Sequence, residues 1–275
     1  MARTRTWLRT GLGSVVDRLP SPHVRAAAYR VYGKRLVAAI PADRRPRHVA
    51  VLLDGNRRWA RSVGEDAATG HRAGGEKVEQ FVGWCDEAGI ELVTLWLLST
   101  DNIRTRHVDE LAPLVSIISE TVRRLAGTGR WRVNLMGDLD LLPAEAAVEL
   151  KTAVAESEGL PGMVVNVAVG YGGRQEITDA VRSLLREHAS AGTSLEALAE
   201  ILDVEHIAGH LYTRGQPDPD LIIRTSGEQR MSGFLIWQSV HSELYFCEAY
   251  WPAFREVDFQ RALRSYALRH RRFGG

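Results

Sequence analysis

Short apolar segments rich in β-branched residues alternate with longer segments of helical spacing, and this alternation constrains the fold most. The apolar segments cover residues 48–53, 91–98, 131–136, 163–169 and 220–223, and the helical ones cover 71–88, 107–126, 143–157, 173–189 and 194–212. The expected strands are continuously apolar, so both of their faces should be buried, as in a mainly parallel sheet. The sequence therefore predicts an α/β fold with a mainly parallel central sheet flanked by helices.

The two ends of this pattern suggest how the chain is divided. Apolar residues recur at helical spacing over 24–40, and Pro41 and Pro46 then end that helix and start a new unit. Two further apolar segments, 234–237 and 244–247, could each add an edge strand or a bend. We therefore expect a helical N-terminal extension over 1–46 and one globular domain over 47–275.

Charge is unevenly distributed although the net charge is only +1. Residues 1–47 hold eleven Lys and Arg against two Asp, which gives +9 and leaves −8 for the remainder. A basic leader suits peripheral contact with an anionic membrane surface, but a solvated first helix explains it equally well. The acidic remainder argues against a nucleic-acid binder, which needs a basic face.

The cellular setting follows from what the sequence lacks. Cys85 and Cys247 lie 162 positions apart with no neighbouring histidine, a pattern that indicates neither a metal site nor a disulfide framework. No apolar stretch is long enough for a transmembrane helix, and the N-terminus lacks the features of a secretion signal. We expect a cytoplasmic protein.

The first expected strand leads into Asp54-Gly55-Asn56-Arg57-Arg58-Trp59. Ligands of such sheets bind beyond the carboxyl ends of the strands. There Arg58 could form a forked contact with phosphate oxygens, and Asp54 could hold a bridging Mg²⁺. Taken alone, the segment fits a βα turn in which Asp54 caps a helix better than it fits a binding site. An aspartyl phosphohydrolase is disfavoured because Asn56 stands where that class has a second acid.

Three other expected strands also end in polar loops, at residues 99–102, 170–174 and 224–232. Each loop alone is weak evidence, because glycine-rich βα loops are usually only turns. The last loop is the most informative, since Arg224, Arg230 and Ser232 supply two guanidinium groups and a hydroxyl within nine residues. That set is sufficient to bind a whole diphosphate.

These loops belong to a series of ordered motifs, namely HVAVLLDGNRRWAR, GHRAGGEK, LLSTDN, NVAVGYGGRQEI, PDLIIRTSGEQRMSGFLIWQ, SELYF and HRRFGG. The series resembles that of the undecaprenyl diphosphate synthase (cis-prenyltransferase) family over residues 47–275. The resemblance implies a catalytic domain with a hydrophobic tunnel, Mg²⁺ as cofactor, and isopentenyl and allylic diphosphates as substrates. It also implies a homodimer in which residues 272–275 reach a neighbour's diphosphate.

The resemblance also implies roles for individual residues. Mg²⁺ would bind Asp54 and Glu243, and Ser99 and Asn102 would orient substrate or accept the proton. The residues binding the allylic diphosphate would be Gly55, Asn56, Arg57, Arg58, Trp59 and His71, and those binding isopentenyl diphosphate Arg224, Arg230 and Ser232. Several positions depart from the commonest family pattern: Arg57 stands for glycine, Ala67 for arginine, Ile103 for tryptophan and Gln229 for histidine. Either Arg104 or Arg106 could take the role of a displaced arginine.

Product length depends on the floor of the implied tunnel. Many long-chain members have alanine two residues before the serine, where this chain has Leu97. The extra bulk should close a tightly packed tunnel early. We therefore expect a C15 product, (2Z,6E)-farnesyl diphosphate, from geranyl and isopentenyl diphosphates, as in short-chain actinobacterial members. Leu97 could instead be an ordinary core residue, and a longer product remains an alternative.

Three other classes compete with this interpretation. An irregular coupling enzyme of the same fold would join two dimethylallyl units. A non-catalytic family member is disfavoured because Asp54 and the diphosphate-binding arginines are present. A Rossmann oxidoreductase is disfavoured because no expected strand is followed by GxGxxG.

Overall fold

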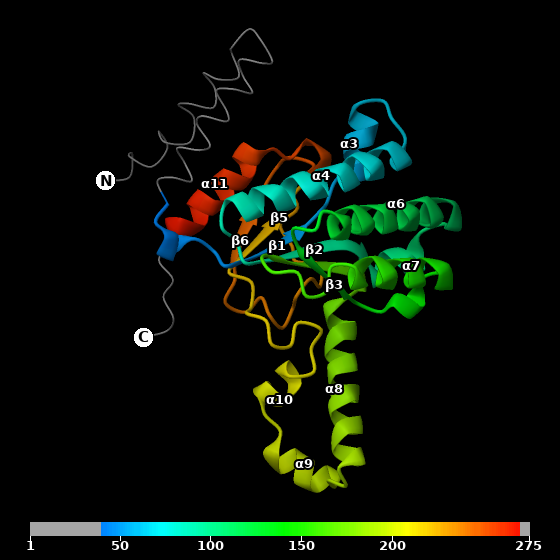
Figure 1. The fold of residues 1–275 in the computed structure, drawn as a ribbon, viewed down its shortest axis with the longest axis vertical. Helices are drawn as coiled ribbons and strands as arrows, with labels where there is room; N and C mark the ends of the chain where they lie inside the picture. Colours follow the sequence, from blue (N-terminus) through cyan, green and yellow to red (C-terminus); the bar gives the residue numbers. More distant parts are fainter. Residues whose placement is uncertain (1–39, 270–275) are drawn as a thin grey trace. The chain divides into compact units, whose positions relative to one another are not determined.

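The computed structural model describes residues 40–269, and Figure 1 shows their fold. They divide into two compact units. One unit comprises residues 46–254 and contains the whole sheet. The described residues of the other are 40–45 and 255–269, with the 3₁₀ helix η1 (Ala42–Arg44) and helix α11 (Glu256–Ala267). The predicted helix over 24–40, apart from its last residue, and the tail 272–275 lie outside the described residues.

Six parallel strands form one sheet in the order β3-β4-β2-β1-β5-β6. Their bounds are β1 His48–Leu52, β2 Leu92–Ser99, β3 Arg132–Met136, β4 Val164–Tyr171, β5 Leu221–Arg224 and β6 Glu243–Phe246. The predicted α/β fold with a parallel sheet is therefore confirmed. Segment 244–247 supplies most of the edge strand, whereas 234–237 forms turns in which Leu235 has a φ of 46°, outside the extended region.

The helices of the sheet-containing unit follow the predicted alternation (Figure 1). They are α3 Asn56–Ser62, α4 Ala67–Glu87, α5 Thr100–Thr105, α6 Val108–Gly127, α7 Ala144–Ala155, α8 Gly173–Ser190, α9 Leu195–Ile201 and α10 Val204–Ala208, with 3₁₀ helices η2 Leu139–Leu141 and η3 Trp251–Ala253. The single helix predicted over 194–212 is wrong. Leu202 is extended, and Asp203 starts a second short helix through a capping box with His206.

The two faces of the sheet are covered differently. Alternate strand residues Ala50, Leu52 and Ile222 pack on one face against Phe234 and Leu235, two buried residues of the turns that follow β5. Helices α4, α6 and α7 pack side by side, and α4 and α6 meet Leu53 and Leu97 around a narrow pocket. Within residues 40–269, no helix is long and apolar enough to cross a membrane.

The amino end of the sheet contains a buried chain of polar side chains. His48 contacts the carbonyl oxygen of Pro217 through Nδ1 and the hydroxyl of Thr94 through Nε2, both at 2.8 Å. Asn166 donates to the same hydroxyl at 3.2 Å and to Gln216 at 2.6 Å. The carbonyl requires a proton on Nδ1, so neutral His48 accepts from Thr94. Burial lowers the pKa of His48 to about 4, which keeps the ring neutral.

Candidate active site

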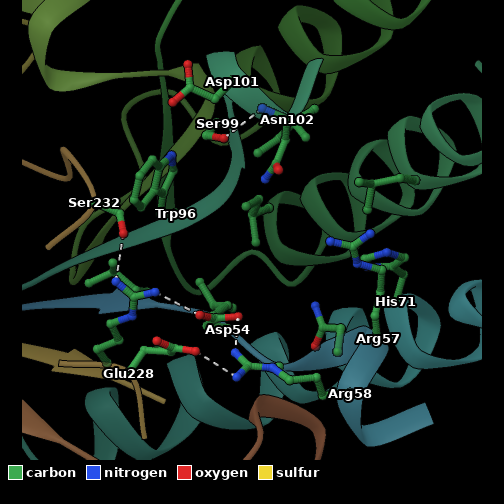
Figure 2. Close-up of a pocket in the computed structure, with 18 of the residues that line it drawn as sticks. Asp54, Arg57, Arg58, His71, Trp96, Ser99, Asp101, Asn102, Glu228 and Ser232 are labelled. Carbon is green, nitrogen blue, oxygen red and sulfur yellow. Dashed lines mark hydrogen bonds and ion pairs between the residues drawn. The ribbon is translucent and has the colours of Figure 1, made fainter. Parts of the chain in front are cut away.

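A cavity of about 600 Å³ opens at the carboxyl ends of β1, β2 and β5 (Figure 2). This volume falls within the range of about 300–1,000 Å³ typical of small-molecule sites. The predicted residues that line it are Asp54, Gly55, Asn56, Arg57, Arg58, His71, Leu97, Ser99, Asn102, Arg224, Arg230 and Ser232. Trp59 and Glu243 are not among its lining residues. Four separate loops and helix starts thus meet at one place.

Asp54 is fixed by its backbone and presents its carboxylate to the cavity. Its N–H donates to the Thr225 hydroxyl at 2.9 Å, and its carbonyl accepts from Thr225 at 2.8 Å and from the Trp251 N–H at 3.0 Å. Gly55, not Asp54, is the N-cap residue of α3, and no side chain caps that helix. The alternative in which Asp54 merely caps a turn is therefore wrong.

The turn after Asp54 requires glycine. Gly55 has a φ of 106°, and a Cβ at this position would lie 2.8 Å from a ring carbon of Tyr250 and 3.0 Å from the Cβ of Ser226. Any other residue would be strained and would collide with both neighbours. The turn carries Arg57 and Arg58 on α3 to the cavity.

The glycines of GHRAGGEK make room for Asn56. A Cβ on Gly70 would lie 2.3 Å from the Asn56 carbonyl oxygen, and one on Gly74 would lie 2.6 Å from its side-chain oxygen. The first turns of α4 therefore approach α3 closely, and Trp251 ties down this region by donating to the Gly74 carbonyl at 2.8 Å. Close packing of this kind fixes the direction of Asn56 into the cavity.

Two arginines converge on the carboxylate of Asp54. Arg224 donates to one oxygen at 2.9 Å, and Arg58 donates to the other at 3.1 Å. Burial alone would raise the pKa of Asp54, but the hydrogen bonds and charges of Arg224 and Arg58 outweigh it and hold the pKa below its usual range. Asp54 is therefore ionised at neutral pH. Arg224 is only 4% exposed and also donates to the Ser232 hydroxyl at 2.8 Å and to the Arg230 carbonyl.

Glu228 is a member of the site that the sequence interpretation missed. It accepts from Arg58 at 2.8 Å and from Arg230, and the hydrogen bonds of Arg58 and then Arg230 lower its pKa. Arg58 is further held by the Ser226 hydroxyl at 2.7 Å. The position of Glu228 in the sequence, between Arg224 and Arg230, was the signal that could have identified it as a site residue. Asp54 and Glu228 together pair with the guanidinium groups of Arg58, Arg224 and Arg230. Figure 2 shows Arg58 between the two carboxylates.

A second charged cluster surrounds His71, on α4. Glu110, which the sequence interpretation also missed, forms an ion pair with Arg106. Its carboxylate oxygen Oε1 lies 3.5 Å from a guanidinium nitrogen of Arg57 and 3.7 Å from Nε2 of His71. Burial and then the charge of Arg106 lower the pKa of His71 to about 4, so the ring is neutral at pH 7. Arg104 is exposed and absent from the cavity lining, whereas Arg106 lines it. Of the two arginines that the sequence left open, Arg106 is the one at the site.

The β2 side of the cavity combines polar and aromatic groups (Figure 2). Ser99 caps α5 by accepting from the Asn102 N–H at 3.0 Å, which fixes both residues beside the cavity. Trp96, which the sequence did not single out as a site residue, also lines it and stacks on Phe234 at 5.1 Å between ring centroids. The pairing of β2 with β4 shifts register on either side of Leu98.

Buried polar atoms without a partner are concentrated at this cavity. Within residues 40–269, the buried side-chain atoms of this kind that belong to lining residues are Asn56 Oδ1, His71 Nδ1, Trp96 Nε1, Arg106 Nε and Arg224 Nε. Buried polar atoms in folded proteins nearly always have hydrogen-bond partners. A concentration of unpaired ones, mostly donors, therefore indicates a site built for a polar, anionic ligand.

Glu243 does not share a site with Asp54 in this chain. Glu243 begins β6 and pairs with Leu221, which in turn pairs with Val49 near the start of β1. Asp54 follows the other end of β1, beyond Leu52, so the Cα atoms of the two residues are separated by roughly 10 Å or more along the strands alone, in addition to the width of the intervening strand β5. One ion cannot be shared by both carboxylates of a single chain in this geometry. The motif SELYF identified the residue but not its place along the strand.

Comparison with known proteins identifies the family. Residues 52–274 match the family described as "Putative undecaprenyl diphosphate synthase". The chain belongs to this family. A "(2Z,6E)-farnesyl diphosphate synthase" from Thermobifida fusca (strain YX) is 63% identical over 252 residues, which cover 91% of this chain and 98% of that protein. A "Short-chain Z-isoprenyl diphosphate synthase" from Mycobacterium leprae (strain TN) is 53% identical over 257 residues, 92% of this chain and 98% of that protein.

Two solved structures have the same fold as this chain. Lavandulyl diphosphate synthase from Lavandula x intermedia, in complex with dimethylallyl diphosphate, superposes with a TM-score of 0.78 at 33% identity, covering 85% of this chain and 100% of the other. A probable undecaprenyl diphosphate synthase from Campylobacter jejuni gives 0.67 at 24% identity, over 84% and 99% of the two chains. The second shows the shared fold alone.

Proposed function

We propose that the protein is a cis-prenyltransferase that condenses isopentenyl diphosphate with geranyl diphosphate to give (2Z,6E)-farnesyl diphosphate and free diphosphate. The observation that carries the proposal is the convergence of Arg58 and Arg224 on Asp54 inside the cavity. Two guanidinium groups held by one carboxylate are ready to exchange that carboxylate for phosphate oxygens. The farnesyl product is that of the relative from Thermobifida fusca.

The two diphosphates would occupy opposite sides of Asp54. Gly55, Asn56, Arg57, Arg58 and His71 would bind the allylic diphosphate. The residues for isopentenyl diphosphate would be Arg224, Arg230 and Ser232, with Trp96 beside them. Neutral His71 can donate or accept a hydrogen bond without adding charge. Trp59 does not line the cavity, so its predicted contact with substrate would have to be indirect.

The donor set of the cavity fits a magnesium ion held jointly with substrate. Asp54 offers a carboxylate whose side chain is 32% exposed, and within residues 40–269 no group of three or more His, Cys, Asp or Glu could hold a metal by itself. Mg²⁺ commonly takes one or two carboxylates and completes its shell with phosphate oxygens and water. Asp54 would therefore hold it, and the bound ion would stabilise charge on the departing diphosphate.

The reaction breaks the bond between the allylic carbon and its diphosphate oxygen and joins that carbon to the terminal alkene carbon of isopentenyl diphosphate. Arg57 and Arg58 would stabilise the negative charge that grows on the departing group. One proton must then leave C2 of the isopentenyl unit. A diphosphate oxygen, or the Ser99 and Asn102 pair beside the cavity, would accept it. Holding both substrates in line supplies much of the remaining rate.

The short product is supported by the surroundings of Leu97. This residue lines the main cavity and also a separate pocket of about 30 Å³ between α4 and α6. Apolar side chains Leu53, Leu114 and Ile118 close that pocket. A prenyl chain growing past Leu97 would find little open space, which favours termination after one addition over a longer product.

The assembly and location remain predictions. The predicted homodimer is consistent with a group of apolar side chains that α8, α9, α10 and the link between α9 and α10 expose, namely Leu185, Leu195, Ile201, Leu202 and Val204. Burial of such a group against a second copy would remove apolar surface from water. A cytoplasmic location and peripheral membrane contact through residues 1–47 rest on the sequence alone.

Product analysis tests the proposal directly. The full chain is incubated with Mg²⁺, isopentenyl diphosphate and either geranyl or dimethylallyl diphosphate, and the products are separated by chain length. A dominant C15 product from geranyl diphosphate supports the proposal, and a C50–C55 product contradicts it. Dimethylallyl diphosphate alone tests irregular coupling, the reaction suggested by the likeness to lavandulyl diphosphate synthase.

A further inference from the structure

The segment that follows Arg230 is held in an unusual conformation. Residues 231–239, here called the covering segment, consist mainly of turns and include Ser232, whose hydroxyl accepts from Arg224. Ser232 has a φ of 49° and Leu235 a φ of 46°, both in the left-handed region that non-glycine residues seldom adopt. Such conformations persist only where the surroundings hold them. The covering segment therefore needs anchors.

Three hydrogen bonds supply those anchors from the region where β4 leads into α8. Gly173 donates its N–H to the carbonyl of Gly233 at 2.9 Å. Leu235 donates its N–H to the Tyr171 hydroxyl at 3.2 Å. Gln238 reaches from the far end of the segment to Glu176 at 3.1 Å.

Glu176, in the first turn of α8, is the centre of this network. Its side chain is 1% exposed and accepts from the Tyr171 hydroxyl at 2.5 Å, from the Tyr212 N–H at 3.1 Å and from Gln238. Among the described residues, no cation forms an ion pair with it. A buried carboxylate without a cation is costly and tolerable only when hydrogen bonds surround it. Of these donors, Gln238 belongs to the covering segment, and Tyr171 holds it through Leu235.

Tyr171 extends the same support to the aromatic wall of the cavity. Its ring stands edge-on to Phe234 at 6.0 Å and to Trp96 at 6.1 Å, while those two rings stack on each other. Phe234 is part of the covering segment, and Trp96 lines the cavity. Tyr171 therefore joins the two parts: its hydroxyl donates to Glu176, and its ring contacts Trp96. Through Tyr171 the network supports both the covering segment and the aromatic wall of the cavity.

We propose that Glu176 is a positioning residue for isopentenyl diphosphate. Through Tyr171 and Gln238 it holds the covering segment, and thereby keeps Ser232 and Arg224 in the arrangement that receives the second diphosphate. This inference rests on the proposed function for the identity of the ligand. Among the described residues, the side chain of Glu176 hydrogen-bonds with Tyr171, Tyr212 and Gln238, none of which belongs to α3 or α4, the helices of the allylic side. The effect should therefore be selective for one substrate.

Steady-state kinetics with both substrates tests this selectivity. Glu176→Ala should raise the KM for isopentenyl diphosphate by about tenfold, the loss expected for removing a buried, charge-assisted hydrogen bond, and change the KM for geranyl diphosphate by less than about threefold. Glu176→Gln keeps an acceptor for Tyr212 and Gln238 and should recover part of the loss. Tyr171→Phe keeps the ring but frees Leu235, and should act in the same direction even if Glu176→Ala fails to fold.

Thr94→Val is the matched control. Thr94 is also fully buried and also joins a polar network, but at the amino end of the sheet. The Thr94→Val variant should lower thermal stability, as Glu176→Gln should, but leave both KM values unchanged. Equal increases in the two KM values for Glu176→Ala and Tyr171→Phe, or a loss of stability with no change in either, would overturn the inference.

A binding measurement separates this inference from the proposed function. Calorimetric titration of isopentenyl diphosphate with Mg²⁺, without allylic substrate, should show an affinity about tenfold weaker in Glu176→Ala than in the wild-type protein. If the wild-type chain binds this ligand but forms no prenyl product, the proposed function fails and the titration still tests Glu176. If product forms normally and both proteins bind the ligand equally, only the inference about Glu176 fails.

Discussion

At the amino end of the sheet, buried polar side chains are neutral and partnered, whereas at the carboxyl end of the same strands they are charged and incompletely partnered. His48, Thr94 and Asn166 hydrogen-bond across β1, β2 and β4, and among the described residues none of them has an unpaired buried side-chain atom. Asp54 and Arg224, which follow β1 and end β5, face a cavity instead.

The difference separates stability from function between the two ends of the same strands. A closed network of neutral hydrogen bonds stabilises the fold and has no spare donor for a ligand. The carboxyl end leaves the donors Arg224 Nε and Arg106 Nε without partners, which weakens the free protein but preserves the affinity of those groups for an anionic substrate. Substitutions at the amino end should therefore change stability but not activity, and substitutions at the carboxyl end should change activity more than stability. Four measurements test this contrast.

Asp54→Asn should give the largest effect. The amide keeps an oxygen for Arg58 or Arg224 but loses the charge that would hold Mg²⁺, so kcat/KM should fall by about 10³-fold. The thermal midpoint should change little, because the side chain remains similar in size and partly exposed. The measurement is Mg²⁺-dependent diphosphate release, with circular dichroism as the control for folding. Activity within tenfold of wild type would remove Asp54 from the chemistry and end the contrast.

His48 should affect the stability of the fold and not the activity. Its folded pKa is about 4, below the value of about 6.5 expected for the unfolded chain, so between those values the unfolded state binds a proton that the folded state does not. Stability should therefore fall as the pH drops from 6.5 to 4, by about 3 kcal/mol from this group alone.

Urea unfolding at several pH values measures that loss, and His48→Gln is the control. The variant lacks this titration but keeps His71 and every other group, so the difference between the two pH profiles isolates His48. Activity per folded molecule should remain unchanged in the variant. Parallel profiles for the two proteins would show that His48 is not held neutral by the fold.

Arg106 and Arg104, at the carboxyl end of α5, provide a smaller but sharper comparison. Arg106 lines the cavity and pairs with Glu110, whereas Arg104, two residues away, is exposed. Arg106→Ala should reduce kcat/KM by about 10²-fold through lost contact with diphosphate, whereas Arg104→Ala should change it by less than about threefold. Kinetics with varied geranyl diphosphate makes the measurement. Equal losses would mean that general positive charge, not placement at the cavity, governs binding.

The sequence predicted the sheet and the motif residues of the site, but not the carboxylates that hold the arginines. Continuous apolar strands predicted the parallel sheet, because burial on both faces makes successive residues apolar in central strands such as β1 and β5. Motif residues such as Asp54 and Arg224 were predicted together because they end neighbouring strands. Glu110 and Glu228 were missed, since a carboxylate that holds an arginine in space has no required spacing in sequence.

Glu243 shows the other limit of sequence interpretation. A motif identifies a residue without stating its register, and pairing with Leu221 places it at the amino end of β6. The split of 194–212 into two helices has a similar cause, because a local capping box at Asp203 outweighed the apolar spacing that favoured one helix. The apolar pattern carries no information on either feature, because the capping box depends on polar side chains and strand register depends on pairing with a neighbouring strand.

Leu97→Ala should have the smallest effect on rate and the clearest effect on product. Leu97 separates the polar cavity from the narrow pocket between α4 and α6, so removing three carbon atoms should join the two spaces. The cavity created should cost about 2–4 kcal/mol of stability, because a half-buried leucine is lost from a packed boundary. Turnover should change only a few-fold, since no diphosphate contact is lost. Chain-length chromatography should show products beyond C15. A product distribution identical to wild type, with the stability loss present, would make Leu97 a core residue and move the chain-length limit to Leu53, Leu114 or Ile118, which close the same pocket.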